Sequence, residues 1–139
     1  MDMRGKVAIV TGGSRGLGRA IALEYAQAGA KVVVCARATS PSGFNSTAQT
    51  VATEIQELGK EATAINCDVT DLVQVQDMIK GVVNRYEQID VLVNNAGIMI
   101  VGEPFDQISP DRWDSIMNVN VRGTYLMCWH VMPIMISQG

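Results

Sequence analysis

Short apolar segments rich in β-branched residues alternate along the chain with segments of helical periodicity, and this alternation most constrains the fold. The four segments expected to be strands are Lys6–Val10, Val32–Cys35, Ala62–Cys67 and Asp90–Val93. The second is a continuous apolar run, which is typical of a strand buried on both faces. Strands that alternate with helices form a parallel sheet with right-handed crossovers, so we predict an α/β fold.

Residues that begin or end helices stand at the expected boundaries. Gly29 follows the first helical pattern, and Asp71 precedes the third, where its side chain can cap the first turn. Ser109 and Pro110 form a typical helix start, with serine at the cap and proline just inside. We expect the last helix to run from Asp111 to Ser137 with a bend near Pro133.

Composition and charge exclude several classes of function. The 139 residues correspond to one domain, and their net charge of −3 leaves no basic excess for binding nucleic acid. The apolar stretch Tyr125–Ile136 is shorter than the roughly 20 residues that span a bilayer, so no membrane role is expected. Cys35, Cys67 and Cys128 contain no CxxC pair, which predicts neither a disulfide framework nor a metal site. We expect small buried thiols in a cytoplasmic protein.

A glycine-rich turn, Thr11–Gly18, separates the first strand from the first helix. Gly12 permits a tight turn, while Gly16 and Gly18 would let a pyrophosphate approach the backbone. The N–H groups of the helix start would then face the phosphates. Ser14 occupies the second glycine position of the common G-x-G-x-x-G pattern, so the alternative of a plain strand–helix turn stays open. The turns at 11–18, 36–38, 67–70 and 94–98 should meet at the carboxyl edge of the sheet.

Four motifs occur in an order that spans residues 6–139. They are the glycine turn, Cys67–Asp71 (CDVTD), Asn94–Gly97 (NNAG), and Trp113 followed seven residues later by Asn120. Together they resemble the short-chain dehydrogenase/reductase family. The resemblance implies a Rossmann-type doubly wound parallel sheet, truncated here after its fourth strand–helix unit. It also implies an NAD(P)-dependent oxidoreductase that interconverts a carbonyl and an alcohol on a small-molecule substrate.

The resemblance assigns roles around a bound dinucleotide. Asp68 would accept a hydrogen bond from the adenine amino group, and the Val69 backbone would meet the ring edge. The alternative for Asp68 is a helix-capping or surface carboxylate. Asn95 and its neighbours would line the adenosine ribose, and Thr11 would tie the glycine turn to that strand end. The full set of expected cofactor-binding residues is Thr11, Gly12, Ser14, Arg15, Gly16, Leu17, Gly18, Arg37, Asp68, Val69, Asn95, Ala96 and Gly97.

The end of the second strand favours NADP(H) over NAD(H). NAD enzymes of this architecture usually place an acidic residue there, but here Ala36 stands in that position and Arg37 follows. Arginine pairs with a 2′-phosphate, and Arg15 adds a second positive charge. The alternative is a solvated arginine at a strand end. The loop from Ala38 to Ser46 is longer than is usual in the family, which leaves the direction of Arg37 open.

Only one of the family's four catalytic residues has a match, and it is Asn120. In the family a tyrosine transfers the proton, a lysine four residues later lowers the tyrosine pKa, a serine polarises the carbonyl, and the asparagine holds a water. No Tyr-x-x-x-Lys occurs among these residues, and Asn118 has weaker spacing to Trp113. His130 is interpreted as a packing or interface residue.

Residues 1–139 are therefore interpreted as the NAD(P)-binding N-terminal portion of a longer enzyme domain, inactive alone. The alternatives are a non-catalytic NADP-binding module, if 139 residues are the complete product, and an unrelated nucleotide-binding α/β protein. The terminal helix is apolar nearly all round. Such a helix needs cover on more than one face, so we expect homo-oligomers to form through it.

Overall fold

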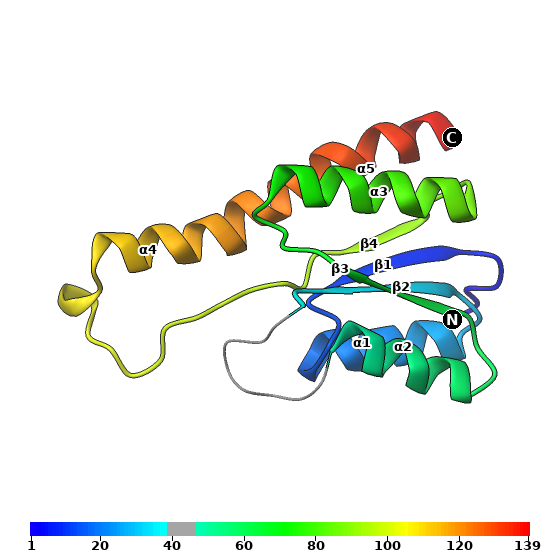
Figure 1. Ribbon diagram of the computed structural model, residues 1–139, viewed down its shortest axis with the longest axis horizontal. Coiled ribbons are helices and arrows are strands. Elements are labelled where there is room, and N and C mark those ends of the chain that lie inside the picture. The colour runs from blue at the N-terminus through cyan, green and yellow to red at the C-terminus, as the bar shows by residue number, and fades with distance from the viewer. Residues whose placement is uncertain (39–46) are drawn as a thin grey trace.

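The computed structural model describes residues 1–38 and 47–139, so most of the predicted loop Ala38–Ser46 lies outside the described residues. A central sheet separates two helical layers (Figure 1): α1 and α2 cover one face, and α3 and α5 cover the other. The elements are β1 Val7–Thr11, α1 Gly16–Gln27, β2 Lys31–Ala36, α2 Ala48–Glu57, β3 Ala62–Asn66, α3 Leu72–Tyr86, β4 Val91–Val93, the short 3₁₀ turn η1 Phe105–Gln107, α4 Pro110–Met117, the π-helical segment η2 Asn118–Gly123 and α5 Thr124–Gln138.

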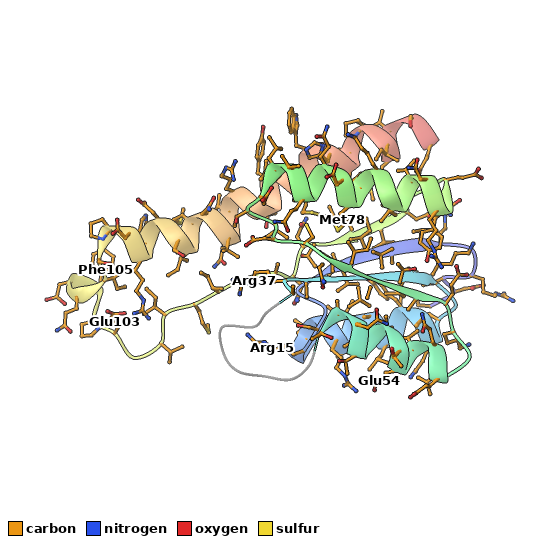
Figure 2. The ribbon with its side chains drawn as sticks, in the orientation of Figure 1. Arg15, Arg37, Glu54, Met78, Glu103 and Phe105 are labelled. Carbon is orange, nitrogen blue, oxygen red and sulfur yellow. The ribbon has the colours of Figure 1, made fainter. Side chains whose placement is uncertain are left out.

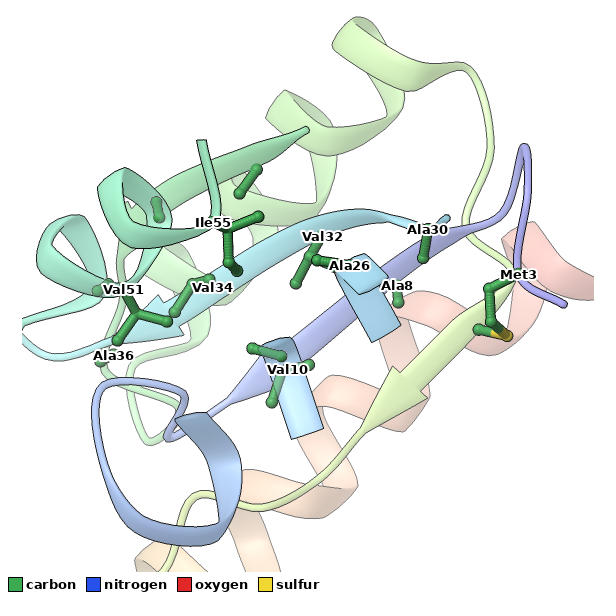
Figure 3. Close-up of a cluster of buried hydrophobic side chains, with 14 residues drawn as sticks. Met3, Ala8, Val10, Ala26, Ala30, Val32, Val34, Ala36, Val51 and Ile55 are labelled. Carbon is green, nitrogen blue, oxygen red and sulfur yellow. The ribbon is translucent and has the colours of Figure 1, made fainter. Parts of the chain in front are cut away.

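The sheet is parallel and has the strand order β3-β2-β1-β4, which confirms the predicted doubly wound α/β fold. Alternate residues of the central strands enter two separate cores. Val10 and Val34 pack with Val51 and Ile55 of α2 in the first core (Figure 3). Their neighbours in sequence enter the second core, on the α3 and α5 side. β2 is thus buried on both faces, as its continuous apolar run predicts.

The predicted helix starts are also confirmed. The Asp71 carboxylate accepts hydrogen bonds from the backbone N–H groups of Val73 and Gln74, at 2.9 and 3.0 Å. These bonds, with the backbone bond from Gln74 the strongest, hold the pKa of Asp71 below its usual value. Ser109 accepts from the N–H of Arg112, and Pro110 is the first helical residue.

The last helical region departs from the predicted course. Pro133 lies inside α5, and the irregularity falls instead at η2, where the helix widens to π geometry. Two long-range contacts fix η2 there. A side chain at Gly123 would stand 2.7 Å from Cγ2 of Val69, so only glycine allows this close approach. Arg122 donates from Nη1 to the Thr70 carbonyl at 2.7 Å. Among the described residues, no helix combines the length and the apolar character needed to cross a membrane.

A glutamine side chain closes the second core at its far end. Gln138 accepts from the Ile89 N–H through Oε1 and donates to the Ile89 carbonyl through Nε2, both at 2.9 Å. Ile89 is completely buried between α3 and β4. Its backbone groups therefore depend on Gln138 for their hydrogen bonds.

We predict that Gln138→Met lowers the free energy of unfolding by about 1–3 kcal/mol, because it leaves two buried backbone groups unpaired. Gln107→Met is the matched control on an exposed turn, with an expected change within about 0.5 kcal/mol. Urea denaturation of both variants measures the difference. Equal stability of the two variants would contradict the role assigned to Gln138.

Candidate functional site

A cleft of about 270 Å³ opens at the carboxyl ends of the strands, where the four predicted turns meet. It is lined by Gly12, Ser14, Arg15, Gly16, Ala36, Arg37, Ala38, Thr47, Cys67, Asp68, Val69, Asn95, Ala96, Gly97, Ile98 and Val119. Ten of the thirteen residues expected to bind a cofactor are in this lining. The other three, Thr11, Leu17 and Gly18, are not, and neither is Asn120.

The glycine turn packs directly against the segment after β4. Gly12 has a φ of +63°, and a Cβ there would lie 2.9 Å from the Ala96 Cα atom. A Cβ at Gly18 would collide with the Gly12 carbonyl and the Asn95 amide. Gly16 has a φ of +53° and open space beside it. Gly18 is therefore required for helix packing, whereas Gly16 leaves the backbone accessible.

Thr11 and Asn95 join the turn to β4 through a closed set of hydrogen bonds. The buried Thr11 hydroxyl donates to the Val93 carbonyl at 3.2 Å and accepts from the N–H groups of Asn95 and Ala96, both at 3.0 Å. In return, the Asn95 amide donates to the carbonyls of Thr11 and Gly12, at 3.0 and 3.1 Å. The two residues thus hold the cleft walls in place from behind, which is the linking role expected for Thr11.

The start of α1 has the properties of an anion site. Its N-cap residue is Arg15, whose side chain makes no capping hydrogen bond, and its first turn contains no acidic residue. First-turn N–H groups have no partner within a helix and carry partial positive charge. Arg15 and Arg37 both line the cleft and lie at the same end of the sheet (Figure 2). These features fit the diphosphate of a dinucleotide, and Leu17 lies in the same turn with an exposed side chain.

Asp68 lies on the opposite wall of the cleft, and one of its two carboxylate oxygens accepts hydrogen bonds from the protein. Oδ1 accepts from the backbone N–H and the hydroxyl of Thr70, at 2.9 and 2.7 Å. Within the described part of the chain, Oδ2 makes no hydrogen bond, so it can accept one from an amine. The helix-capping alternative for Asp68 is wrong, because Asp71 is the cap of α3.

Asn120 uses its side chain to hold the segment after β4. Its Oδ1 accepts from the Ile98 N–H at 2.9 Å, and its Nδ2 donates to the Ile98 carbonyl at 2.8 Å. The Asn120 carbonyl accepts from the Thr124 hydroxyl at 3.0 Å. Asn118 makes no such contact and accepts only a long bond from Arg122. Asn120 is therefore a positioning residue in this structure.

Comparison with known proteins decides the family. A model of the family described as short chain dehydrogenase matches residues 6–139. The chain belongs to the short-chain dehydrogenase/reductase family. It is 43% identical to the short-chain dehydrogenase/reductase FrzI of a Cladobotryum species over 84% of this chain and 43% of the relative. It is 38% identical to the 3-oxoacyl-(acyl-carrier-protein) reductase FabG of Staphylococcus epidermidis over 96% of this chain and 52% of the relative.

Solved structures agree with this assignment. A metagenomic short-chain oxidoreductase, solved in complex with NADP, shares 36% identity and a TM-score of 0.86. That alignment covers 98% of this chain and 59% of the other. The chain thus spans about half the length of the curated relatives it matches.

Six lining residues lie outside the predicted cofactor-binding set. Ala36, Ala38, Cys67 and Ile98 belong to turns that were expected at this edge, whereas Thr47 and Val119 do not. Cys67 belongs to the CDVTD motif, but a cysteine among apolar residues is typical of a residue that packs in the core. Thr47 caps α2 by accepting a hydrogen bond from the Thr50 N–H. A threonine in front of a helical segment is the sequence signal that could have placed this residue at the cleft. Val119 reaches the cleft only because η2 docks there, and no local pattern marks it.

We predict that Gly18→Ala lowers the free energy of unfolding by about 1–3 kcal/mol, because the added methyl group collides with the Gly12 carbonyl. Gly81→Ala is the matched control, since Gly81 is also helical and has open space around it. The control should be neutral or slightly stabilising. Thermal or urea unfolding compares them, and a neutral Gly18→Ala would contradict the packing role.

Proposed function

We propose that the protein is an NAD(P)-dependent oxidoreductase that interconverts a carbonyl and an alcohol on a small-molecule substrate, with residues 1–139 as its dinucleotide-binding part. One observation carries the proposal. The glycine turn and the NNAG segment are hydrogen-bonded through Thr11 and Asn95 into one wall of a cleft that is also lined by residues at the N-terminus of α1. Membership in the short-chain dehydrogenase/reductase family supports the same activity.

The chain's own residues would bind and orient the cofactor. The diphosphate would accept hydrogen bonds from N–H groups at Gly16 and Leu17, and the Asp68 carboxylate would accept one from the adenine amine. Asn95, Ala96 and Gly97 would border the ribose. The nicotinamide, when bound, supplies or accepts a hydride. Asn120 would keep the backbone at Ile98 in position beside the reacting groups.

The activity is tested with the natural, full-length protein. We expect it to consume NADPH in the presence of small carbonyl compounds, measured by the loss of reduced-nicotinamide absorbance. A polypeptide of residues 1–139 should show no turnover above background, because these residues include no Tyr-x-x-x-Lys to supply the proton. Failure of the full-length protein to bind NADPH or NADH would overturn the proposal.

We further propose that NADP(H) is preferred to NAD(H). Arg37 and Arg15 line the cleft, and Ala36 leaves no carboxylate at the end of β2 to repel a 2′-phosphate. Arg37 is exposed, and its side chain makes no hydrogen bond or ion pair with the described residues. It is therefore available to a ligand. The related metagenomic oxidoreductase solved with NADP supports this preference.

We predict that Arg37→Asp weakens NADP binding by about tenfold or more, because it removes a charge-assisted bond to phosphate and adds a repelling charge. NAD binding should change little or improve. Lys60→Asp is the control, since it makes the same charge change away from the cleft. Calorimetric titration with both nucleotides gives the ratio, and an unchanged ratio in Arg37→Asp would exclude Arg37 from specificity.

We also propose a homo-oligomer that forms through the last helical region. Exposed apolar side chains recur there every three or four residues, at Met117, Val121, Tyr125, Trp129, Met132 and Ile136. The Tyr125 and Trp129 rings stack with centroids 6.3 Å apart. A stripe of this kind needs a covering surface. Light scattering should show more than one copy per particle, and a monomeric full-length protein would contradict the proposal.

The three free thiols support a reducing, cytoplasmic location.

A further inference from the structure

Two thiols that the proposed function does not use lie next to each other beside the cleft. Cys35 is near the end of β2, and Cys67 directly follows β3. The Cys67 N–H donates to the Ala36 carbonyl at 2.9 Å, so the chain still runs alongside β2 at that point. The Cys35 sulfur lies 4.0 Å from the Cys67 carbonyl oxygen, and both side chains enter the same core.

The two thiols differ in pKa and in their position relative to the cleft. A hydrogen bond between them raises the pKa of Cys35, and burial raises it further. The same bond lowers the pKa of Cys67, against the opposing effects of burial and of the carboxylates of Asp68 and Asp71. Cys67 is therefore the better nucleophile of the two. Cys67 lines the cleft and Cys35 does not, although both are core residues, with 2% of Cys67 and none of Cys35 exposed.

We propose that Cys35 and Cys67 form a peroxide-sensitive thiol pair whose oxidation displaces the wall of the cleft that carries Asp68 and weakens nucleotide binding. The Cys67 thiolate attacks one oxygen of a hydroperoxide such as hydrogen peroxide, the O–O bond breaks, and Cys67 becomes a sulfenic acid as water leaves. The Cys35 sulfur then attacks the Cys67 sulfur, the S–O bond breaks, and a second water leaves. Two thiols lose two electrons and two protons, and the peroxide is reduced to two waters.

The position of Cys67 connects this chemistry to binding. Cys67 immediately precedes Asp68 and Val69, which line the cleft. A disulfide imposes its own spacing and dihedral angle on the two residues, so Cys67 must move toward β2 when the bond forms. The wall that carries Asp68 moves with it. A nucleotide already in the cleft would instead cover Cys67 and slow its oxidation.

The experiment uses the purified full-length protein treated with hydrogen peroxide. Peptide mapping under non-reducing conditions should find Cys35 linked to Cys67, with Cys128 left as a thiol. NADPH affinity should fall by about tenfold or more and return after treatment with dithiothreitol. Bound NADP should slow formation of the link. Cys128→Ser is the control and should oxidise like the wild type, because Cys128 does not line the cleft.

Cys35→Ser should abolish both the link and the loss of affinity, while the untreated variant still binds NADPH, because Cys35 does not line the cleft. The proposal is overturned if peroxide modifies only Cys128, or if the link forms without any change in affinity. It is equally overturned if bound NADP leaves the rate unchanged. The effect on affinity rests on the proposed function, but peptide mapping of the disulfide needs no cofactor. A protein that never binds NADPH would overturn the proposed function, and the mapping would still show whether Cys35 and Cys67 form a disulfide.

Discussion

The hydroxyl group of Thr11 is the contact on which the site depends. It accepts two backbone N–H groups from the segment after β4 and donates to the last carbonyl of that strand. Side-chain bonds from Asn95 then return to the glycine turn. A threonine hydroxyl makes one donor and two acceptor contacts at most, so this group is fully used. The turn after β1 and the turn after β4 consequently behave as one rigid unit.

The last helical region holds the segments after β3 and β4 through a different set of contacts. The π-helical segment η2 presents Asn120 to the backbone of Ile98 and Gly123 to Val69. Arg122 adds a bond to the Thr70 carbonyl. The segments after β3 and β4 are therefore both held by one turn of a helix that begins more than twenty residues later. A widened turn is uncommon in helices, and this one contributes Val119 to the lining of the candidate site.

The sequence predicts those features that local signals determine. The burial of β2, the caps at Asp71 and Ser109 and the meeting of four turns at one edge all follow from short patterns. The π geometry at 118–123 could not be predicted, because it depends on contacts of Gly123 and Asn120 with distant segments. The packing constraint at Gly18 could not be predicted either, for a related reason. Its spacing is visible in the sequence, but the Gly12 carbonyl that excludes a side chain there is not.

We propose that this cleft holds a dinucleotide in one defined orientation. A crystal structure of the full-length protein with NADP tests it most directly. We expect the diphosphate at the N-terminus of α1, the adenine beside Asp68 and Val69, and the 2′-phosphate between Arg15 and Arg37. A nucleotide bound elsewhere, or bound with its diphosphate away from the glycine turn, would overturn the proposed binding site.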